Sequence, residues 1–481
     1  MKRPNLSFFL AVVLLSEGVY LTVFTRPFPL ARWYTTIPPV DYAKLTGHSA
    51  WWTAAFVLGV IVLFGLYGAA MALPHPPLAP YSGLVFAATL FFGYPTLAID
   101  LFIYAIRTRG WALYGLNPLA TAPLSFPPTD PWLGLAAEWV DAPSPYGPLW
   151  EVLSLGAFRV TGGDFLLHLF ALKAIAVLAY LACIALIGAI LGQLRPAWRT
   201  TGMLAFAWNP LVLLETAQNA HNDIVMVALL LASVWALVRR RDGAAMLLLA
   251  MSVLVKFVTV LAAPFFLLYL ARKQPTLSRR LAALAGYGVL FAVPVIAGML
   301  PLWPGWNHWA VLKANSGAGR SLLALLVLAL RGRLGTGTAF DVSRLLLNGG
   351  WAAATLWALW HRRKRLAAVE TPLLLSWVLF FSYVLLAAPV FHAWYLLWFL
   401  PLAILLPEPV PLRASLVFCF TALLVIPYFE TVRVWIPALL QNHLLGHAIG
   451  VPLLVLPPAW AALPSGRGKG DGDATDAGRG A

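Results

Sequence analysis

Residues 94–150 have the sequence YPTLAIDLFIYAIRTRGWALYGLNPLATAPLSFPPTDPWLGLAAEWVDAPSPYGPLW. This stretch decides the fold class because it begins as a membrane segment and ends as an aqueous one. Residues 83–97 are apolar, whereas Asp100 is followed by charges, eight prolines within about thirty residues and several Trp and Tyr, a mixture typical of membrane interfaces. Asp100 therefore lies where a span leaves the bilayer, as either a solvated helix end or a functional carboxylate.

The whole chain is very apolar for its length. Of its 481 residues, 61% are hydrophobic and 11% are charged, and its mean hydropathy is +0.81. A soluble globule of this size needs more polar surface, so we expect an all-α, polytopic membrane protein. The net charge of +15 comes from short basic clusters between apolar runs, which is how cytoplasmic loops are marked. This pattern indicates topology and contact with anionic membrane lipid rather than a nucleic-acid partner.

Apolar runs predict a transmembrane helix bundle of about 12–14 spans. The runs lie near 6–24, 50–73, 83–105, 166–192, 200–217, 222–238, 281–300, 345–360, 371–390, 394–407, 413–428 and 435–458. Residues 6–24 are assigned as the first span and not as a signal peptide, because no small-residue cleavage site follows them. Cys183 and Cys419 fall inside apolar runs, so we expect them to be packing residues without a disulfide or a metal.

The predicted organisation has four parts. They are N-terminal spans over 1–82, a catalytic membrane core over 83–407 with a large outer loop at 98–165, C-terminal spans over 408–463, and a disordered cytoplasmic tail over 464–481. The tail has nothing apolar to bury. Residues 321–330 are apolar but short, so we expect a re-entrant or interfacial helix there.

Residues 244–271 require a different path through the membrane. Basic residues flank both ends, with RRRD at 239–242 before the segment and several Arg and Lys between 272 and 280 after it. Both ends should therefore face the cytoplasm. At ~1.5 Å per residue, this length allows two half-length helices that meet at a turn, but not two full spans. Lys256 would lie near that turn, and irregular backbone at membrane depth is tolerated only beside a cavity or inside protein.

On this topology, polar side chains from four distant segments reach the outer face. The clusters are Asp100 with Tyr104, Arg107 and Arg109; Glu215, Asn219, His221, Asn222 and Asp223 in the turn of 209–223; His308, Lys313 and Arg320 in 303–320; and His392 with Tyr395 in 389–401. Each histidine or aromatic residue alone also fits an interfacial role. Four clusters on one face are better explained by a site.

Carboxylates beside cations at a membrane surface suit sugar transfer from a lipid-linked phosphate donor. Asp100 would act as general base by accepting the proton of the incoming hydroxyl. The candidate donor or phosphate ligands, which would stabilise the charge of the leaving group, are His221, Lys256, Arg320 and His392. The candidate supporting residues are Tyr104, Glu215, Asn222, Asp223 and Tyr395.

Other reaction classes have less support in the sequence. HExxH, paired CxxC, P-loop and GxSxG motifs are absent, so zinc, nucleotide and serine hydrolysis are not indicated. The Asp and His of HND (221–223) could ligate a divalent ion, but too few oxygen ligands accompany them to argue for a metal. We therefore expect no cofactor.

At these residues the sequence resembles the GT-C integral-membrane glycosyltransferases, and within them the polyprenol-phosphate-mannose-dependent alpha-mannosyltransferases of actinobacterial lipomannan synthesis. The resemblance runs from about 83 to 407. The matching stretches are IDLFIYAIRTRGWALYGLNPL (99–119) with DAPSPYGPLW (141–150), NPLVLLETAQNAHNDIVMVALLL (209–231), VLVKFVTVLAAPFFLLY (253–269) and HAWYLLWFLPL (392–402). HAW replaces the HPW typical of the family.

The resemblance implies an extracytoplasmic active site in the plasma membrane, a polyprenyl-phosphate sugar donor and inversion at the anomeric carbon. It also implies a catalytic Asp on the first large outer loop, the position that Asp100 occupies. The acceptor would be a glycan or a lipid, and the sugar a hexose, with mannose expected. The sequence leaves two alternatives open: a transporter or flippase of a lipid-linked sugar, against which the large outer loop and the lack of internal repeats argue, and a non-catalytic scaffold.

Overall fold

The computed structural model describes residues 6–305 and 319–463. His308, Lys313 and the tail predicted to be disordered at 464–481 lie outside the described residues. Within the described ranges the regular secondary structure is helical, apart from two isolated β-bridges, Pro29 with Gly93 and Gly319 with Val390. The prediction of an all-α protein is confirmed.

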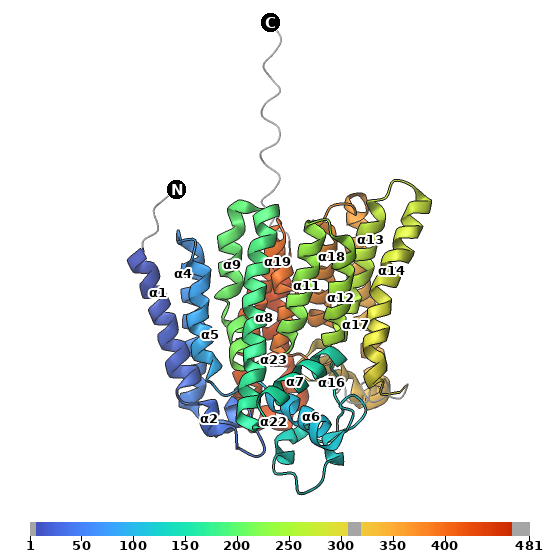
Figure 1. The fold of residues 1–481 in the computed structure, drawn as a ribbon. Helices are drawn as coiled ribbons and strands as arrows, with labels where there is room; N and C mark the ends of the chain where they lie inside the picture. The colour runs from blue at the N-terminus through green and yellow to red at the C-terminus, as the bar shows by residue number, and fades with distance from the viewer. Residues whose placement is uncertain (1–5, 306–318, 464–481) are drawn as a thin grey trace.

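The long helices run side by side between an upper and a lower face (Figure 1). The N-terminal part holds α1 (Leu6–Val19), α2 (Leu30–Trp33), α3 (Tyr42–Leu45), α4 (Ala50–Ala72) and α5 (Gly83–Phe91). The middle part holds α6 (Asp100–Tyr114), α7 (Pro148–Val160), α8 (Phe165–Leu194), α9 (Arg199–Ala207), α10 (Pro210–Leu213), α11 (Asp223–Val238), α12 (Asp242–Val255), α13 (Ala263–Arg272) and α14 (Leu277–Met299). The C-terminal part holds α16 (Leu322–Leu334), α17 (Thr336–Arg362), α18 (Glu370–Ser382), α19 (Leu400–Leu405), α20 (Pro409–Pro427), α21 (Arg433–Trp435), α22 (Pro437–Gln441) and α23 (His443–Ala461).

Among the described residues, seven helices are long and apolar enough to cross a membrane, or eight if one bent pair counts as a span. The seven are Leu6–Thr25, Ala50–Ala72, Phe165–Leu194, Leu277–Leu302, Glu370–Ala387, Pro409–Trp435 and His443–Ala461. This number is lower than the predicted 12–14, because several apolar runs form short helices that break. The short ones are Ala79–Phe91, Asp242–Val255, Phe257–Arg272 and Ala393–Leu405. Hydropathy measures the length of an apolar run but does not locate such breaks.

The segment between α5 and α8 gathers on the lower face, where α6 and α7 lie (Figure 1). Its irregular residues pack against α8 and form hydrogen bonds with α6. Trp132 stacks on Phe165 at the start of α8, with ring centroids 4.5 Å apart. Asp130 accepts hydrogen bonds from Arg109 Nε at 2.8 Å and from the Tyr114 hydroxyl at 2.5 Å. This segment is therefore a packed part of the fold, and it holds Asp100 at the mouth of the bundle.

The basic flanks of residues 244–271 lie at the upper face, opposite α6 and α7 (Figure 1). α12 ends at Val255, Lys256 is extended (φ −153°, ψ 124°), and a 3-10 turn over Phe257–Ala262 leads into α13. The two short helices thus meet at Lys256 and return to the side from which they started, as the basic flanks predict.

Two smaller predictions also concern the fold. α16 has 13 residues, about 20 Å of helix at 1.5 Å per residue, which is shorter than a hydrocarbon core of about 30 Å. It lies toward the lower face in Figure 1. Cys183 and Cys419 are free and fully buried in the hydrophobic core, so both are packing residues, as predicted.

Candidate active site

Asp100 is the first residue of α6 and is only 8% exposed. The positive end of the helix dipole favours a carboxylate at this position. The Tyr146 hydroxyl donates a hydrogen bond to Asp100 Oδ1 at 2.8 Å, and Asp100 lines a cavity of ≈ 650 Å³. A carboxylate fixed in this way at a cavity wall is suited to accept a proton from a bound hydroxyl.

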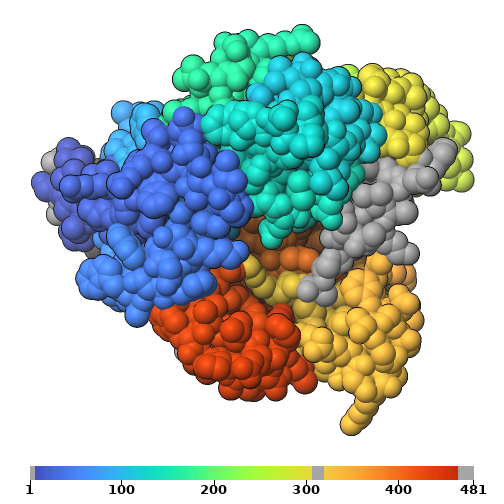
Figure 2. Space-filling model, turned by 90° about the horizontal axis from the view of Figure 1, so that it is seen from below, coloured from blue at the N-terminus to red at the C-terminus, as the bar shows by residue number. Residues whose placement is uncertain are grey.

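The cavity lies on the lower face, where Figure 2 shows a hollow between segments coloured blue, teal, amber and red. Its volume is in the range of small-molecule sites. Its wall comes from residues 38–44, 96–100, 137–139 and 391–394, from residues between 425 and 431, and from Glu215 and Arg320. The N-terminal and C-terminal parts of the chain therefore contribute to the wall, in addition to the core predicted at 83–407.

A sharp turn in the chain brings polar residues of 209–223 to this wall. Asn209 caps α10 by accepting hydrogen bonds from two backbone N–H groups, and Pro210 occupies the first turn, as is typical of helix starts. A π-helical turn over Leu214–Gln218 follows, and Ala220 adopts φ 58° before α11 begins. The two helical pieces meet at 116°. This reversal directs the residues of the turn toward Asp100.

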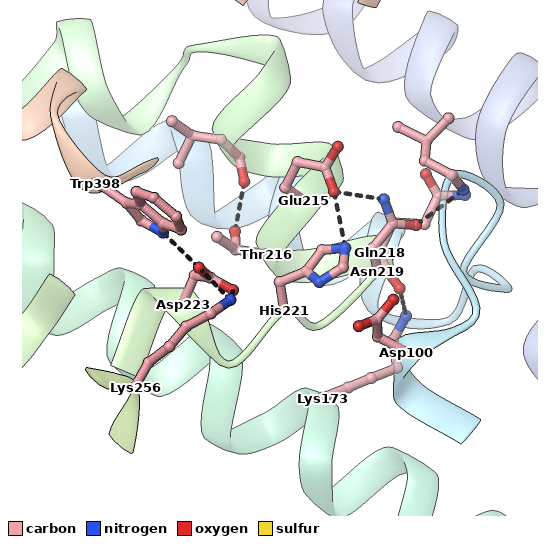
Figure 3. Close-up of polar contacts among 12 residues, drawn as sticks. Asp100, Lys173, Glu215, Thr216, Gln218, Asn219, His221, Asp223, Lys256 and Trp398 are labelled. Carbon is pink, nitrogen blue, oxygen red and sulfur yellow. Dashed lines mark hydrogen bonds and ion pairs between the residues drawn. The ribbon is translucent and has the colours of Figure 1, made fainter. Parts of the chain in front are cut away.

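Glu215 and His221 form a buried pair within the turn (Figure 3). His221 Nε2 lies 3.2 Å from Glu215 Oε2, and both side chains are 0% exposed. Asn219 Nδ2 donates to the same carboxylate oxygen at 2.9 Å. Glu215 borders the cavity, and its Oε2 atom contacts both His221 and Asn219.

Lys256 and Asp223 form a second pair (Figure 3). Lys256 Nζ lies 2.8 Å from both carboxylate oxygens of Asp223, and Trp398 Nε1 donates to Asp223 Oδ1 at 2.5 Å. The ammonium also lies 5.6–5.7 Å from the ring centroids of Tyr146, Tyr395 and Trp398, within the range of cation–π attraction. A carboxylate and three aromatic rings thus surround this partly buried ammonium.

Tyr146 connects Asp100 to Lys256. Its hydroxyl bonds to Asp100 and its ring faces the Lys256 ammonium. Tyr104 packs edge-on against that ring, with centroids 5.1 Å apart. Asp100, Lys256 and Tyr104 were predicted from the sequence as base, cation and supporting residue, and all three contact Tyr146. Tyr146 itself was not among the predicted residues.

Gly147 fixes the position of Tyr146. Its N–H donates to the Val255 carbonyl at the end of α12, at 2.9 Å. A Cβ at this position would lie 2.0 Å from the Leu254 carbonyl oxygen, so only glycine fits the approach. The lower-face loop is thereby locked onto the turn that bears Lys256.

His221 and His392 sandwich Trp394. The ring centroids are 3.9 Å apart for His221 and Trp394, and 4.1 Å apart for His392 and Trp394, with both pairs stacked at 20°. His392 and Trp394 line the cavity. The two predicted histidines therefore belong to one stack of three rings.

The predicted arginines have partners of their own. Arg320 adopts φ 53° and pairs with the Glu430 carboxylate, and both residues line the cavity. Arg109 pairs with Asp130, and Arg107 donates to the carbonyls of Ala142 and Pro143 at 3.0 and 3.1 Å. Of these arginines, only Arg320 reaches the cavity.

Two further polar residues are fully buried near these groups. Burial raises the pKa of Glu151, while a hydrogen bond from Ser144 at 2.5 Å and the charge of Arg107 offset part of that rise. The hydrogen bond between Ser144 and Glu151 holds the loop that carries Tyr146. Asn222 is 0% exposed, and its side-chain amide has no hydrogen-bond partner in the described structure.

Within residues 6–305 and 319–463, no group of three His, Cys, Asp or Glu side chains is placed to hold a metal ion. Lys256 takes both oxygens of Asp223, the carboxylate that the sequence suggested as a ligand.

Sequence reasoning missed Lys173, a single cation inside the apolar run of α8. Its side chain is 0% exposed, and Nζ donates to the Gly93 carbonyl at 2.8 Å and the Gln218 carbonyl at 2.5 Å. Lys173 thus ties the segment before Asp100 to the turn before His221 (Figure 3). The rarity of charge inside a span was the signal that could have identified it.

Comparison with known proteins supplies the family. Residues 32–272 match the family described as Alpha-(1->6)-mannopyranosyltransferase, N-terminal domain, a match that covers half of the chain. The chain belongs to this mannosyltransferase family. The resemblance noted from the four sequence stretches is therefore confirmed at the level of the family.

A curated member of the mannosyltransferase family gives the same assignment. The chain is 27% identical over 189 residues to Alpha-(1->6)-mannopyranosyltransferase A of Mycobacterium tuberculosis (strain ATCC 25618 / H37Rv), which is 38% of this chain and 35% of that protein. The match thus spans about a third of the relative's length. The family match includes Asp100, His221, Asp223 and Lys256, and it ends before His392.

Proposed function

We propose that the protein transfers a mannosyl residue from a polyprenyl-phosphate donor to a glycan acceptor, with inversion at the anomeric carbon. In this proposal the chain has the GT-C architecture, and residues 98–165 form its active-site loop. The family assignment supports mannose as the sugar that is transferred. The polyprenyl-phosphate donor and the inversion are what the resemblance to the GT-C mannosyltransferases implies, and the contacts within the site support the roles proposed for individual residues.

The observation that carries the proposal is the position of Tyr146. It hydrogen-bonds Asp100 and places its ring 5.6 Å from the Lys256 ammonium. A carboxylate that lines the cavity and a cation therefore lie on two sides of Tyr146. Displacement at a sugar carbon requires a base for the incoming hydroxyl and positive charge near the departing phosphate.

We propose the following reaction at this site. The acceptor hydroxyl oxygen attacks the anomeric carbon and passes its proton to the Asp100 carboxylate. The bond between that carbon and the phosphate oxygen breaks, and polyprenyl phosphate leaves with the electron pair. Attack from the face opposite the phosphate inverts the configuration.

The donor phosphate is proposed to bind beside Lys256. An ammonium has three N–H donors, and two of them bond to Asp223, which leaves one for a phosphate oxygen. His392 and His221 flank Trp394 at the cavity wall and are proposed to contact the donor from that side. Because Arg320 pairs with Glu430, its proposed role is secondary.

The lower face is proposed to be extracytoplasmic. The basic residues around 239–241 and 272–280 lie at the upper face (Figure 1), and short loops rich in Lys and Arg remain in the cytoplasm. Asp100 and the cavity would then face the periplasmic or outer side. A polyprenyl donor would enter with its chain in the bilayer.

The test is donor turnover by the purified full-length chain. Incubation with polyprenyl-phosphate mannose and a manno-oligosaccharide should release polyprenyl phosphate and lengthen the acceptor by one residue. Asp100→Asn keeps the size and accepts the Tyr146 hydrogen bond but cannot take the proton, so turnover should fall about 10²-fold or more. Asp141→Asn, an exposed acid of the same loop, is the matched control.

Near-normal turnover by Asp100→Asn would remove Asp100 as the base. Movement of the intact donor across a vesicle membrane without release of polyprenyl phosphate would instead support a flippase. If neither process occurs with the wild-type chain, the transfer proposal fails.

A further inference from the structure

The cavity that holds Asp100 is rich in carboxylates. Five of its lining residues are Asp or Glu and two are Lys or Arg: Asp41, Asp100, Glu138, Glu215 and Glu430 against Lys44 and Arg320. Each of these two cations is already paired, Lys44 with Asp41 at 3.5 Å and Arg320 with Glu430. The carboxylates of Asp100, Glu138 and Glu215 therefore line the cavity without a Lys or Arg partner among the described residues.

The same wall also contains buried polar atoms that have no hydrogen-bond partner in the described structure. Thr96 Oγ1 and Glu215 Oε1 have no hydrogen-bond partner in the described structure, and their residues are 1% and 0% exposed. Both residues line the cavity. Buried polar atoms of native proteins usually have partners, so the wall is suited to a ligand that can donate several hydrogen bonds.

The outer, more exposed part of the wall combines acid and aromatic groups, because Glu138 is exposed and Trp139 is half-buried. Glu138 and Trp139 follow Ala137, whose strained backbone (φ 45°, ψ −125°) turns them to the cavity. Strained backbone of this kind is found where the surrounding structure holds a functional geometry. Glu138 has no ion-pair partner among the described residues, which leaves its carboxylate available to a ligand.

Sugar hydroxyls are donors that match carboxylate oxygens, and a sugar ring lays its C–H face on an aromatic side chain. An anionic group on the acceptor would face the carboxylates of Asp41 and Glu138, which is unfavourable. We propose that the outer half of the cavity, at Asp41, Glu138 and Trp139, binds the neutral sugar residues of the acceptor behind the one that reacts, and rejects anionic acceptors. This inference rests on the proposed transfer reaction and assigns its acceptor side.

The experiment measures binding to the detergent-solubilised full-length chain without turnover. The probes are a neutral manno-oligosaccharide and the same oligosaccharide carrying one phosphate. Glu138→Gln and Asp41→Asn remove charge and keep shape, and Asn still accepts the cap hydrogen bond that Lys44 N donates to Asp41 at 3.0 Å. Each should weaken binding of the neutral probe about threefold to tenfold, because charge-assisted hydrogen bonds are lost.

The phosphorylated probe distinguishes a binding role from a structural one. The phosphorylated probe should bind the double variant, Glu138→Gln with Asp41→Asn, more tightly than it binds the wild type. The neutral probe should bind the double variant more weakly than the wild type. The matched control is Asp164→Asn, which caps α8 through Leu167 N at 2.8 Å and does not line the cavity. Equal affinity of wild type and variants for both probes would overturn the inference.

Failure of this inference is distinguishable from failure of the proposed reaction. If the wild type releases polyprenyl phosphate but the variants keep their affinity for both probes, the acceptor site lies elsewhere and the reaction stands. If the wild type binds the neutral oligosaccharide with the expected charge preference but never consumes donor, the glycan site stands and the reaction fails.

Discussion

At the scale of single residues, the site depends on charges that are buried with a partner. Asp223 is 0% exposed in its side chain and takes its charge balance from Lys256. Asp100 has a hydroxyl partner and a helix terminus in place of a cation. A carboxylate paired with a cation and one without a cation partner thus lie in the same site.

Lys256→Met alone should lower the free energy of unfolding by about 3–5 kcal/mol, because it leaves the Asp223 carboxylate buried without a cation. Adding Asp223→Asn should recover most of that loss, since Asn can still accept the hydrogen bond from Trp398. Chemical denaturation in detergent micelles measures both effects. If Lys256 holds the phosphate, the double variant should be stable yet bind donor weakly. Wild-type donor affinity in the double variant would remove Lys256 from the donor site.

Asp130 gives a dependence on pH. Burial raises its pKa, but hydrogen bonds from Tyr114, Arg109 and the Trp132 backbone lower it more, so its pKa lies below the ordinary value of about 3.9. Because the pKa of Asp130 is lower in the folded protein, its ionised form stabilises the fold at pH values above its ordinary pKa. This stabilisation is lost as the pH falls through the pKa of the folded state. Proteolysis of the 115–147 loop should therefore accelerate below about pH 4. Asp130→Asn should be cut faster at pH 7 and respond less to acid, and an unchanged acid response would contradict this assignment.

At the scale of elements, the site is made where helices break. α10 and α11 meet at a sharp turn bearing Glu215 and His221, and α12 and α13 meet at Lys256. A break in a helix leaves backbone N–H and C=O groups without their helical hydrogen bonds, and these groups need other partners at membrane depth. Lys173 supplies one such partner by donating to the Gly93 and Gln218 carbonyls.

Gly147→Ala tests the contact between two of these elements. Gly147 has φ −83°, which alanine adopts readily, so any effect comes from the 2.0 Å approach of the new Cβ to the Leu254 carbonyl oxygen. Relief of that clash must move Tyr146 relative to α12. Turnover should fall about 10²-fold, as expected for displacement of a positioned group by about 1 Å. Gly156→Ala in α7, where the Cβ meets nothing within 4 Å, should keep wild-type turnover, and equal activity of the two variants would argue against the role of Gly147.

At the scale of the whole molecule, composition was enough to predict a helical membrane protein. Basic flanks predicted the break at Lys256, and polar density predicted the turn of 209–223. The span count was too high because a hydropathy run does not show its breaks, although Asn209-Pro210 was a visible helix start. Tyr146 and Trp394 were missed because the sequence holds many aromatic residues, and only the fold decides which of them faces Asp100 or a histidine.

Labelling of introduced cysteines tests the orientation of the whole bundle. Cysteines at positions 241 and 275 should react with an impermeant maleimide only from the cytoplasmic side, and one at 141 only from outside. Arg241, Pro275 and Asp141 are exposed, while the native Cys183 and Cys419 are 0% exposed and should give little background. Labelling of 241 and 275 from opposite sides would contradict the helix pair that turns at Lys256.

The wall of the cavity joins residues near 40 to residues near 430, and this has a consequence for biosynthesis. The ribosome delivers the chain from the N-terminus, so Asp100 enters the membrane long before Glu430 is synthesised. Until the last helices insert, Asp100 has no enclosed cavity around it. On the proposed function, a nascent or prematurely ended chain should therefore be unable to consume donor, and the cell would be spared wasteful hydrolysis of a costly lipid-linked sugar.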